Sequence, residues 1–102
     1  MATYQVVYWQ EIPVQVDARE AGLAHKQPLS PRFQQLVDTA ARQRHLDSAE
    51  DYIRAWIHGQ RLNRPGPAAE VARAVAAELE AQFERIRDAA LGSGPSRLSS
   101  AM

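Results

Sequence analysis

Three kinds of side chain in this sequence could do chemistry: histidines as metal ligands, carboxylates as an acid–base pair, and arginines as an anion site. A metal site needs histidines at ligand spacing, but His25, His45 and His58 fall in three separate segments without it. The chain has no cysteine, which excludes disulfides and thiolate ligands. We therefore expect no metal site and no cofactor.

The carboxylates closest to the aromatic N-terminal segment are Glu11 and Asp17. General acid–base catalysis by such a pair requires both groups to converge in a desolvated pocket. A turn residue and a strand-end residue are usually hydrated instead. The sequence also lacks the GxGxxG, P-loop, HExxH and GxSxG motifs. We expect no catalytic residues.

Arg54, Arg61 and Arg64 form the one basic cluster of the sequence, and His58 lies among them. Guanidinium groups bind carboxylates and phosphates through paired hydrogen bonds. A hydrated surface is the ordinary interpretation of such a cluster, and a site for an anion or an acidic partner is the alternative. The sequence leaves both open.

The elements that must position these side chains begin with residues 4–16, where aromatic and β-branched residues are densest. Alternation predicts one strand over residues 4–9 and a second over 12–17, joined by a turn. Pro13 lacks an N–H, so the second strand should lie at a sheet edge or pair on one side only near Pro13. A short third strand over residues 25–29 would complete the sheet.

Helical periodicity predicts two helices after the strands. Ser30 and Pro31 indicate the start of the first, which should end near His45. Its apolar stripe consists of Phe33, Leu36, Val37, Ala40 and Ala41. The second should begin at Asp47 or Ser48 and end at Gly59. Its buried stripe would be Tyr52, Ile53, Trp56 and Ile57.

A third, long helix is predicted from Pro67 to about Ala90, after a loop over residues 60–67. Its far end, residues 79–91, either overhangs the domain as a dimer or partner contact, or folds back on the sheet. The serine- and glycine-rich residues 92–102 should form a disordered tail.

Together these elements predict an α+β fold, with a small N-terminal antiparallel sheet of two or three strands covered by three helices. Residues 1–91 would form one domain. Twelve basic and twelve acidic residues cancel, which argues against nucleic-acid and anionic-membrane partners. No apolar run approaches the ~20 residues of a membrane span. No signal peptide is apparent in residues 1–20, so we expect a cytoplasmic protein.

The two tryptophans are expected mainly in the core, where Trp56 would pin the second helix to the sheet. The burial of Trp9 is less clearly predicted, because Trp9 shares a strand face with polar Gln5 and that face could be open to a partner.

Several short strings of residues carry a family resemblance that runs over roughly residues 3–90. They are Tyr8-Trp9-Gln10-Glu11-Ile12-Pro13 with Gln15-Val16, then Arg32-Phe33, then Asp51-Tyr52-Ile53 followed by Trp56. In this order and spacing the chain resembles the small bacterial proteins of the virulence factor domain family. The resemblance implies a bacterial protein with no catalytic residues to assign. It also implies an accessory role beside corrinoid and folate one-carbon methyltransferases.

Two functions remain open from the sequence. The first is a non-enzymatic interaction module that binds a larger protein, or a second copy through residues 79–91. Its candidate partner-binding residues are Trp9, Glu11, Arg54, His58, Arg61 and Arg64. The second is a small enzyme or ligand-binding protein with a pocket between sheet and helices. Its lining would be Tyr8, Glu11, Tyr52 and His58.

Overall fold

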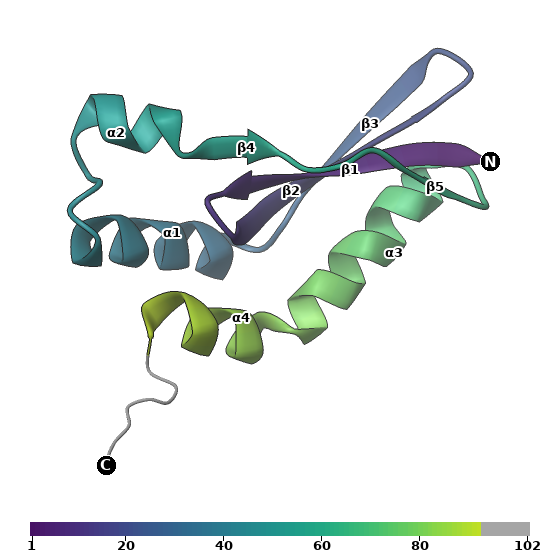
Figure 1. Cartoon of the computed structure of the whole chain (residues 1–102). Helices are drawn as coiled ribbons and strands as arrows, with labels where there is room; N and C mark the ends of the chain where they lie inside the picture. The colour runs from purple at the N-terminus through teal and green to yellow at the C-terminus, as the bar shows by residue number, and fades with distance from the viewer. Residues whose placement is uncertain (93–102) are drawn as a thin grey trace.

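The computed structural model describes residues 1–92 and has an α+β fold, as the sequence predicts (Figure 1). The disordered tail predicted over residues 92–102 lies outside the described residues, except for Gly92. The elements are β1 (Ala2–Trp9), β2 (Ile12–Glu20), β3 (Leu23–Pro28), α1 (Pro31–Gln43), α2 (Ala49–Arg54), β4 (Trp56–His58), β5 (Leu62–Arg64), α3 (Ala68–Ala81) and α4 (Phe83–Leu91). Helices α1, α3 and α4 lie on one side of the sheet, and α2 lies beyond its end (Figure 1).

The sheet is antiparallel and has five strands in the order β3-β2-β1-β4, with β5 also paired to β1. The two predicted N-terminal strands are confirmed as β1 and β2. The third is confirmed as β3 and is longer than expected, whereas β4 and β5 were not predicted. The expected count of two or three strands is therefore wrong. Strand β1 is central, because β2 pairs along one side of it and β4 and β5 pair along the other.

Pro13 pairs with Tyr8 of β1, next to a register shift that leaves Val14 without a partner in the β1–β2 ladder. Strand β3 pairs with β2 only from Gln15 onward. Near Pro13, β2 is therefore paired on one side only, which confirms the prediction from the missing N–H. The irregularity has the form of a bulge, which bends and twists a strand locally.

Helix α1 confirms the sequence prediction at its start and along its apolar stripe. It begins directly after Ser30 with Pro31 in its first turn, and all five predicted stripe residues are buried. The Ser30 hydroxyl does not cap its own helix. It donates instead to Glu80 of α3, as described below.

The second predicted helix is much shorter than expected, because α2 ends at Arg54 and residues 56–58 form β4. Ile53 and Ile57, predicted to be buried, have exposed fractions of 68% and 49%. Gly59 is not a helix cap: its N–H donates to the Val6 carbonyl at 2.8 Å, beside β1. Strand β5 lies inside the segment predicted to be a loop. Pairing with β1 thus decides the structure of residues 56–64.

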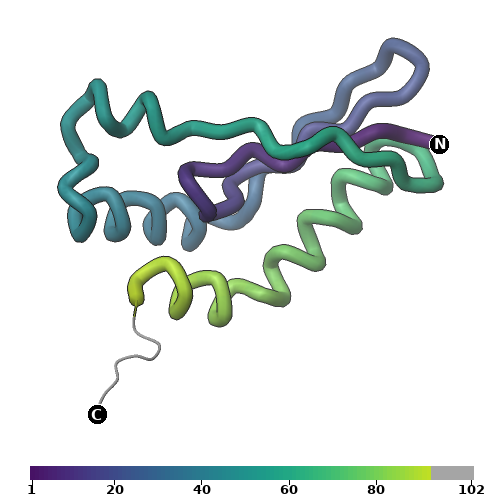
Figure 2. The backbone as a smooth tube through the Cα atoms, in the orientation of Figure 1, coloured from purple at the N-terminus to yellow at the C-terminus, as the bar shows by residue number. Residues whose placement is uncertain are grey.

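The long third helix is divided in two at Gln82, so that the described part of the chain has four helices rather than three. Helix α3 runs along the helix side of the sheet, and α4 bends from the end of α3 to lie beside α1 (Figure 2). The Phe83 ring meets the Phe33 ring edge to face, with centroids 5.0 Å apart. The far end therefore folds back onto α1, and the overhang does not occur. A homodimer through residues 79–91 stays a prediction.

The core lies between the sheet and the helices. Its largest fully buried side chains come from β1, β2, α1 and α3: Trp9, Ile12, Val16, Phe33, Val37 and Val71. Hydrophobic burial at this interface holds the sheet in place, and the opposite face of the sheet remains open to solvent.

Candidate interaction surface along a sheet edge

Trp9, the first predicted partner-binding residue, is fully buried. Its indole N–H donates to the Tyr52 carbonyl at 3.0 Å, and the two rings lie 5.7 Å apart between centroids. Trp9 therefore holds the end of β1 against α2. Its side chain offers no accessible surface to a partner.

Glu11 lies in the β1–β2 turn and binds Arg44, directly after α1. The same guanidinium also donates to Gln10 and, at 2.6 Å, to the Ala90 carbonyl of α4. The hydrogen bond from Arg44 lowers the pKa of the Glu11 carboxyl. Glu11 and Arg44 thus join the β1–β2 turn to two helices. Asp17 has a different partner, Gln15, so the two carboxylates are not brought together.

The three arginines predicted to cluster have three different partners. Arg54 forms an ion pair with Glu50 on α2, at 2.7 Å. Arg64 forms one with Glu78 of α3, at 2.8 Å, and this hydrogen bond raises the pKa of Arg64. Arg61 instead donates to two neutral oxygens, Thr3 Oγ1 at 3.4 Å and Gln5 Oε1 at 3.2 Å.

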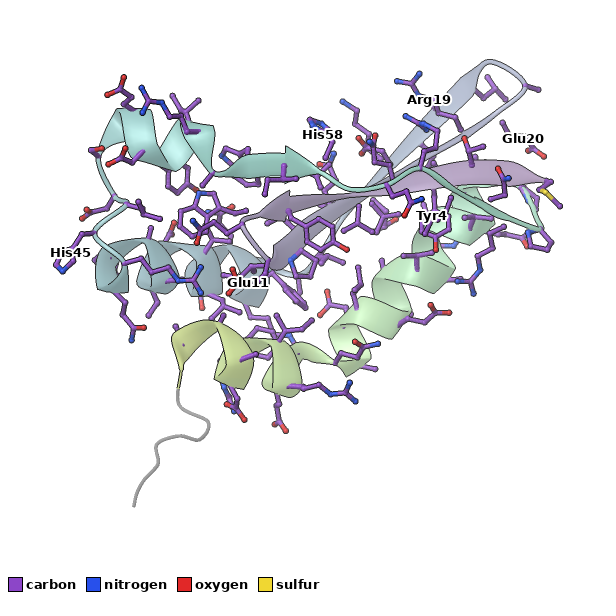
Figure 3. The ribbon with its side chains drawn as sticks, viewed as in Figure 1. Tyr4, Glu11, Arg19, Glu20, His45 and His58 are labelled. Atoms are coloured by element: carbon purple, nitrogen blue, oxygen red, sulfur yellow. The ribbon has the colours of Figure 1, made fainter. Side chains whose placement is uncertain are left out.

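Arg61 and His58 do come together, on the face of the sheet that the helices leave open. Thr3, Gln5 and Val7 alternate along β1 with the residues that face the helices. His58 is opposite Val7 in the register, and Arg61 bonds to the other two. Figure 3 shows His58 on the side of the sheet away from α1 and α3.

Apolar side chains of the same segment lie on the helix side of the sheet. Ile57 is opposite Tyr8 in the register and Leu62 is opposite Tyr4, both half-buried tyrosines. Ile57 and Leu62 retain exposed fractions of 49% and 43%, because the helices do not cover this part of the sheet. We call residues 56–64 the β4–β5 edge. It carries the exposed Ile57 and Leu62 toward the helix side, together with Arg64, which is paired with Glu78, and it carries His58 and Arg61 toward the open side.

Gly59 lies in the middle of the β4–β5 edge and allows the Tyr8 ring to approach the backbone closely. A Cβ atom at Gly59 would lie 2.9 Å from Tyr8 Cε2 and 3.0 Å from the Val6 carbonyl oxygen. Gln5 Nε2 also donates to the Gly59 carbonyl, at 2.9 Å. These contacts fix the edge against β1, so its exposed side chains are held in a defined arrangement.

The structure of residues 1–92 has no pocket lined by the four residues that the sequence suggested for one, Tyr8, Glu11, Tyr52 and His58. Tyr8 and His58 lie on opposite faces of the sheet, and Glu11 is bound to Arg44. The Tyr52 hydroxyl accepts a hydrogen bond from Gln34 of α1, at 2.9 Å. Three surface hollows lie elsewhere: by the β2–β3 turn, between β3 and α3, and between α1 and α4. None of the three is lined by Tyr8, Glu11, Tyr52 or His58.

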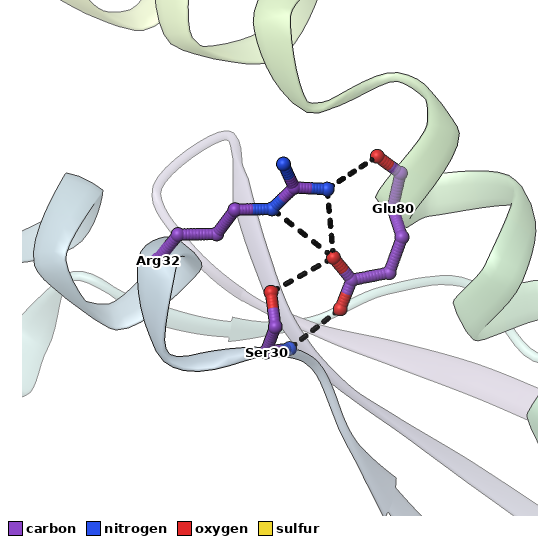
Figure 4. Close-up of polar contacts among 3 residues, drawn as sticks. All are labelled: Ser30, Arg32 and Glu80. Atoms are coloured by element: carbon purple, nitrogen blue, oxygen red, sulfur yellow. Dashed lines mark hydrogen bonds and ion pairs between the residues drawn. The ribbon is translucent and has the colours of Figure 1, made fainter.

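A second polar arrangement, which sequence reasoning missed, holds α1 to the end of α3 (Figure 4). The Glu80 carboxylate accepts from the Ser30 N–H at 2.6 Å, from the Ser30 hydroxyl at 2.8 Å and from Arg32 Nη2 at 3.0 Å. Arg32 also donates to the Glu80 carbonyl, and its guanidinium carbon lies 4.3 Å from the Phe83 ring centroid. We call Ser30, Arg32 and Glu80 the Glu80 clamp.

Two opposing effects act on the charge of Glu80. Partial burial raises its pKa, but the hydrogen bonds from Ser30 and Arg32 together outweigh burial and leave the pKa below its ordinary value. The carboxylate also lies at the start of α1, where the helix dipole favours negative charge. No sequence signal links residues 30 and 80, because their contact arises only from the packing of α1 on α3 and α4.

Two further features of the described residues concern metal binding and membrane crossing. No group of three or more His, Asp or Glu side chains within residues 1–92 is arranged to hold a metal ion. Among the helices described, none combines the length and the apolar character that a bilayer crossing requires.

Comparison with known proteins gives one match. A family model described as "Virulence factor" matches residues 7–91, a range that includes the end of β1, the whole β4–β5 edge and α4. Neither the curated proteins nor the solved structures include a match to the chain.

Proposed function

The chain belongs to the virulence factor family, and from this premise we propose that it is a small non-enzymatic module that binds a larger protein through its β4–β5 edge. The edge is a defined surface that the chain's own helices leave open. Binding there requires no movement of the core.

One observation carries this proposal: exposed apolar side chains gather beside one sheet edge. Within residues 1–92 five large apolar residues are exposed, and three of them, Ile53, Ile57 and Leu62, lie on α2, β4 and β5. Exposed apolar residues scattered singly need no explanation, whereas a group on one surface marks an interaction site. Isoleucine and leucine there would be removed from water by a bound partner.

The family resemblance supports a finer proposal. The partner would be a component of a corrinoid or folate one-carbon methyltransferase, and the module would act beside it in the bacterial cytoplasm. Identifying the bound protein tests this part separately from the binding itself.

Photo-cross-linking in the native cells tests the module function. A benzoylphenylalanine residue at position 57 is compared with one at position 23, because Leu23 is exposed too but lies on β3, at the opposite edge. We expect a light-dependent adduct with one larger protein from position 57 and none from position 23. Mass spectrometry of the adduct then identifies the partner. Equal adducts from both positions, or none from position 57, would refute binding at this edge.

A further inference from the structure

The β4–β5 edge has the features of a strand that can accept another strand. Both β4 and β5 pair with β1, and neither has a second neighbour within residues 1–92. Edge strands direct unpaired backbone N–H and C=O groups outward and can pair with another chain. At the opposite edge, β3 contains Lys26 and ends at Pro28, residue types that hinder such pairing.

The exposed apolar side chains of the β4–β5 edge and its cationic side chains without a carboxylate partner lie on different faces of the sheet. Ile57 and Leu62 lie on the helix side, and His58 and Arg61 lie on the open side. An added strand would also place successive side chains on alternate faces. Its apolar residues would meet Ile57 and Leu62 if every second residue were apolar.

The charges on the open face of the sheet indicate which residues of the added strand would lie on that face. Arg54 and Arg64 are already paired with Glu50 and Glu78. Arg61 bonds only to neutral oxygens, and among the described residues no carboxylate forms an ion pair with it. Asp17, on the same open face, is bonded to Gln15. A carboxylate supplied by another molecule would give Arg61 the counter-ion that residues 1–92 do not provide.

The same charges argue against a second copy of this chain as the occupant. Two β4–β5 edges paired with each other would bring together cationic side chains from both copies, without an acidic residue between them. Like charges at an interface disfavour such an association. An acidic segment of a different protein fits better.

We propose, on the basis of the proposed function, that the partner adds an extended segment of alternating acidic and apolar residues as a further strand on the β4–β5 edge. Backbone hydrogen bonds would supply affinity, and the alternating side chains would supply selectivity, as in other strand-addition complexes. Arg61 would bind a carboxylate of the segment, while Ile57 and Leu62 would pack against its apolar side chains.

Selection from a random 12-residue peptide library displayed on phage tests the chemistry of the occupant without assuming its sequence. We expect the enriched peptides to alternate acidic and apolar residues. Enrichment of basic peptides, or of peptides with helical apolar spacing, would refute the proposal. So would an absence of enrichment, and a cross-linked adduct at position 57 would then still support the module function.

The best enriched peptide is then measured by fluorescence anisotropy against matched variants. Arg61→Glu should weaken binding about tenfold or more, whereas Lys26→Glu, the same charge change at the β3 edge, should not. Arg61→Gln is a second variant in case the glutamate disturbs folding, which circular dichroism would detect. Equal binding by wild type and both Arg61 variants would refute the assignment of Arg61.

A backbone-modified peptide separates strand addition from other modes of binding. N-methylation at alternate residues keeps every side chain but removes the N–H groups that an added strand would donate. We expect one of the two alternate methylation patterns to abolish binding and the other to be tolerated. Equal affinity for both patterns and for the unmodified peptide would refute strand addition.

Discussion

The Glu80 clamp and the β4–β5 edge each contain an arginine that bonds to other segments of the chain, but only the clamp supplies that arginine with a counter-ion. Arg32 binds the Glu80 carboxylate and lies over the Phe83 ring. Arg61 bonds to neutral oxygens on the open face of the sheet, whereas the exposed Ile57 and Leu62 of the same edge lie on the helix side. In the clamp the chain completes its own interactions. At the edge these interactions are incomplete, and we infer that another molecule completes them.

This comparison assigns different tasks to the two parts of the molecule. The clamp and the buried residues near it should determine stability, because their partners are within the chain. The edge should contribute little to stability and much to binding. Measurements of stability can therefore separate the two tasks before any partner is known.

Replacement of Trp9 by alanine should have the largest effect on stability. Trp9 is fully buried and its indole N–H donates to the Tyr52 carbonyl, so the change would leave a large cavity and remove this hydrogen bond. We expect a loss of about 3–5 kcal/mol in the free energy of unfolding. Urea unfolding followed by circular dichroism measures it.

Ile53→Ala is the matched control for Trp9→Ala, because Ile53 lies on the exposed surface of α2. Its effect should remain within about 0.5 kcal/mol. Similar losses for the two variants would contradict the division between a stabilising core and a surface kept for binding.

Much of the fold could be predicted because its signals are local. The Ser30-Pro31 start and the apolar stripe of α1 lie within one helix, and the alternation of β1 and β2 lies within each strand. Strands β4 and β5 have three residues each, too few to show a period. Tyr52, Ile53, Trp56 and Ile57 fit a helical stripe as well, and only pairing with β1 decides between the two structures.

The candidate site was predictable in part for the same reason. His58 and Arg61 were recognised as a possible anion or partner site, and the structure places both on the open face. That Arg64 pairs with Glu78 depends on how α3 packs on the sheet. The break at Gln82 has no glycine or proline to signal it, and it allows Phe83 to reach Phe33. Such contacts between distant residues leave no local pattern.

Replacement of Glu80 by glutamine should have a smaller effect that depends on pH. The change keeps the shape but removes the charge that Ser30 and Arg32 stabilise. Charge-assisted hydrogen bonds are stronger than neutral ones, so we expect a loss of about 1–3 kcal/mol in the free energy of unfolding at pH 7.

The pH dependence of this loss follows from the lowered pKa of Glu80 in the folded protein. The carboxylate stabilises the fold fully above its unfolded pKa of about 4.3, and this contribution disappears as the pH falls through the folded pKa. Unfolding of wild type and variant should therefore differ at pH 7 and converge in acid. Glu84→Gln, an exposed change on α4, should produce no such difference. A constant gap at all pH values would contradict the role of the charge.

The smallest effect on stability is expected for Arg61→Gln, and it tests the comparison most directly. Because Arg61 donates only long hydrogen bonds to neutral oxygens at the surface, the free energy of unfolding should change by no more than about 0.5 kcal/mol. Arg32→Gln removes the guanidinium from the Glu80 clamp and should destabilise the protein measurably more. Parallel urea titrations of the two variants provide the test. If both arginines contributed equally to stability, Arg61 would be a structural residue like Arg32, and its lack of a carboxylate partner would no longer point to a binding role.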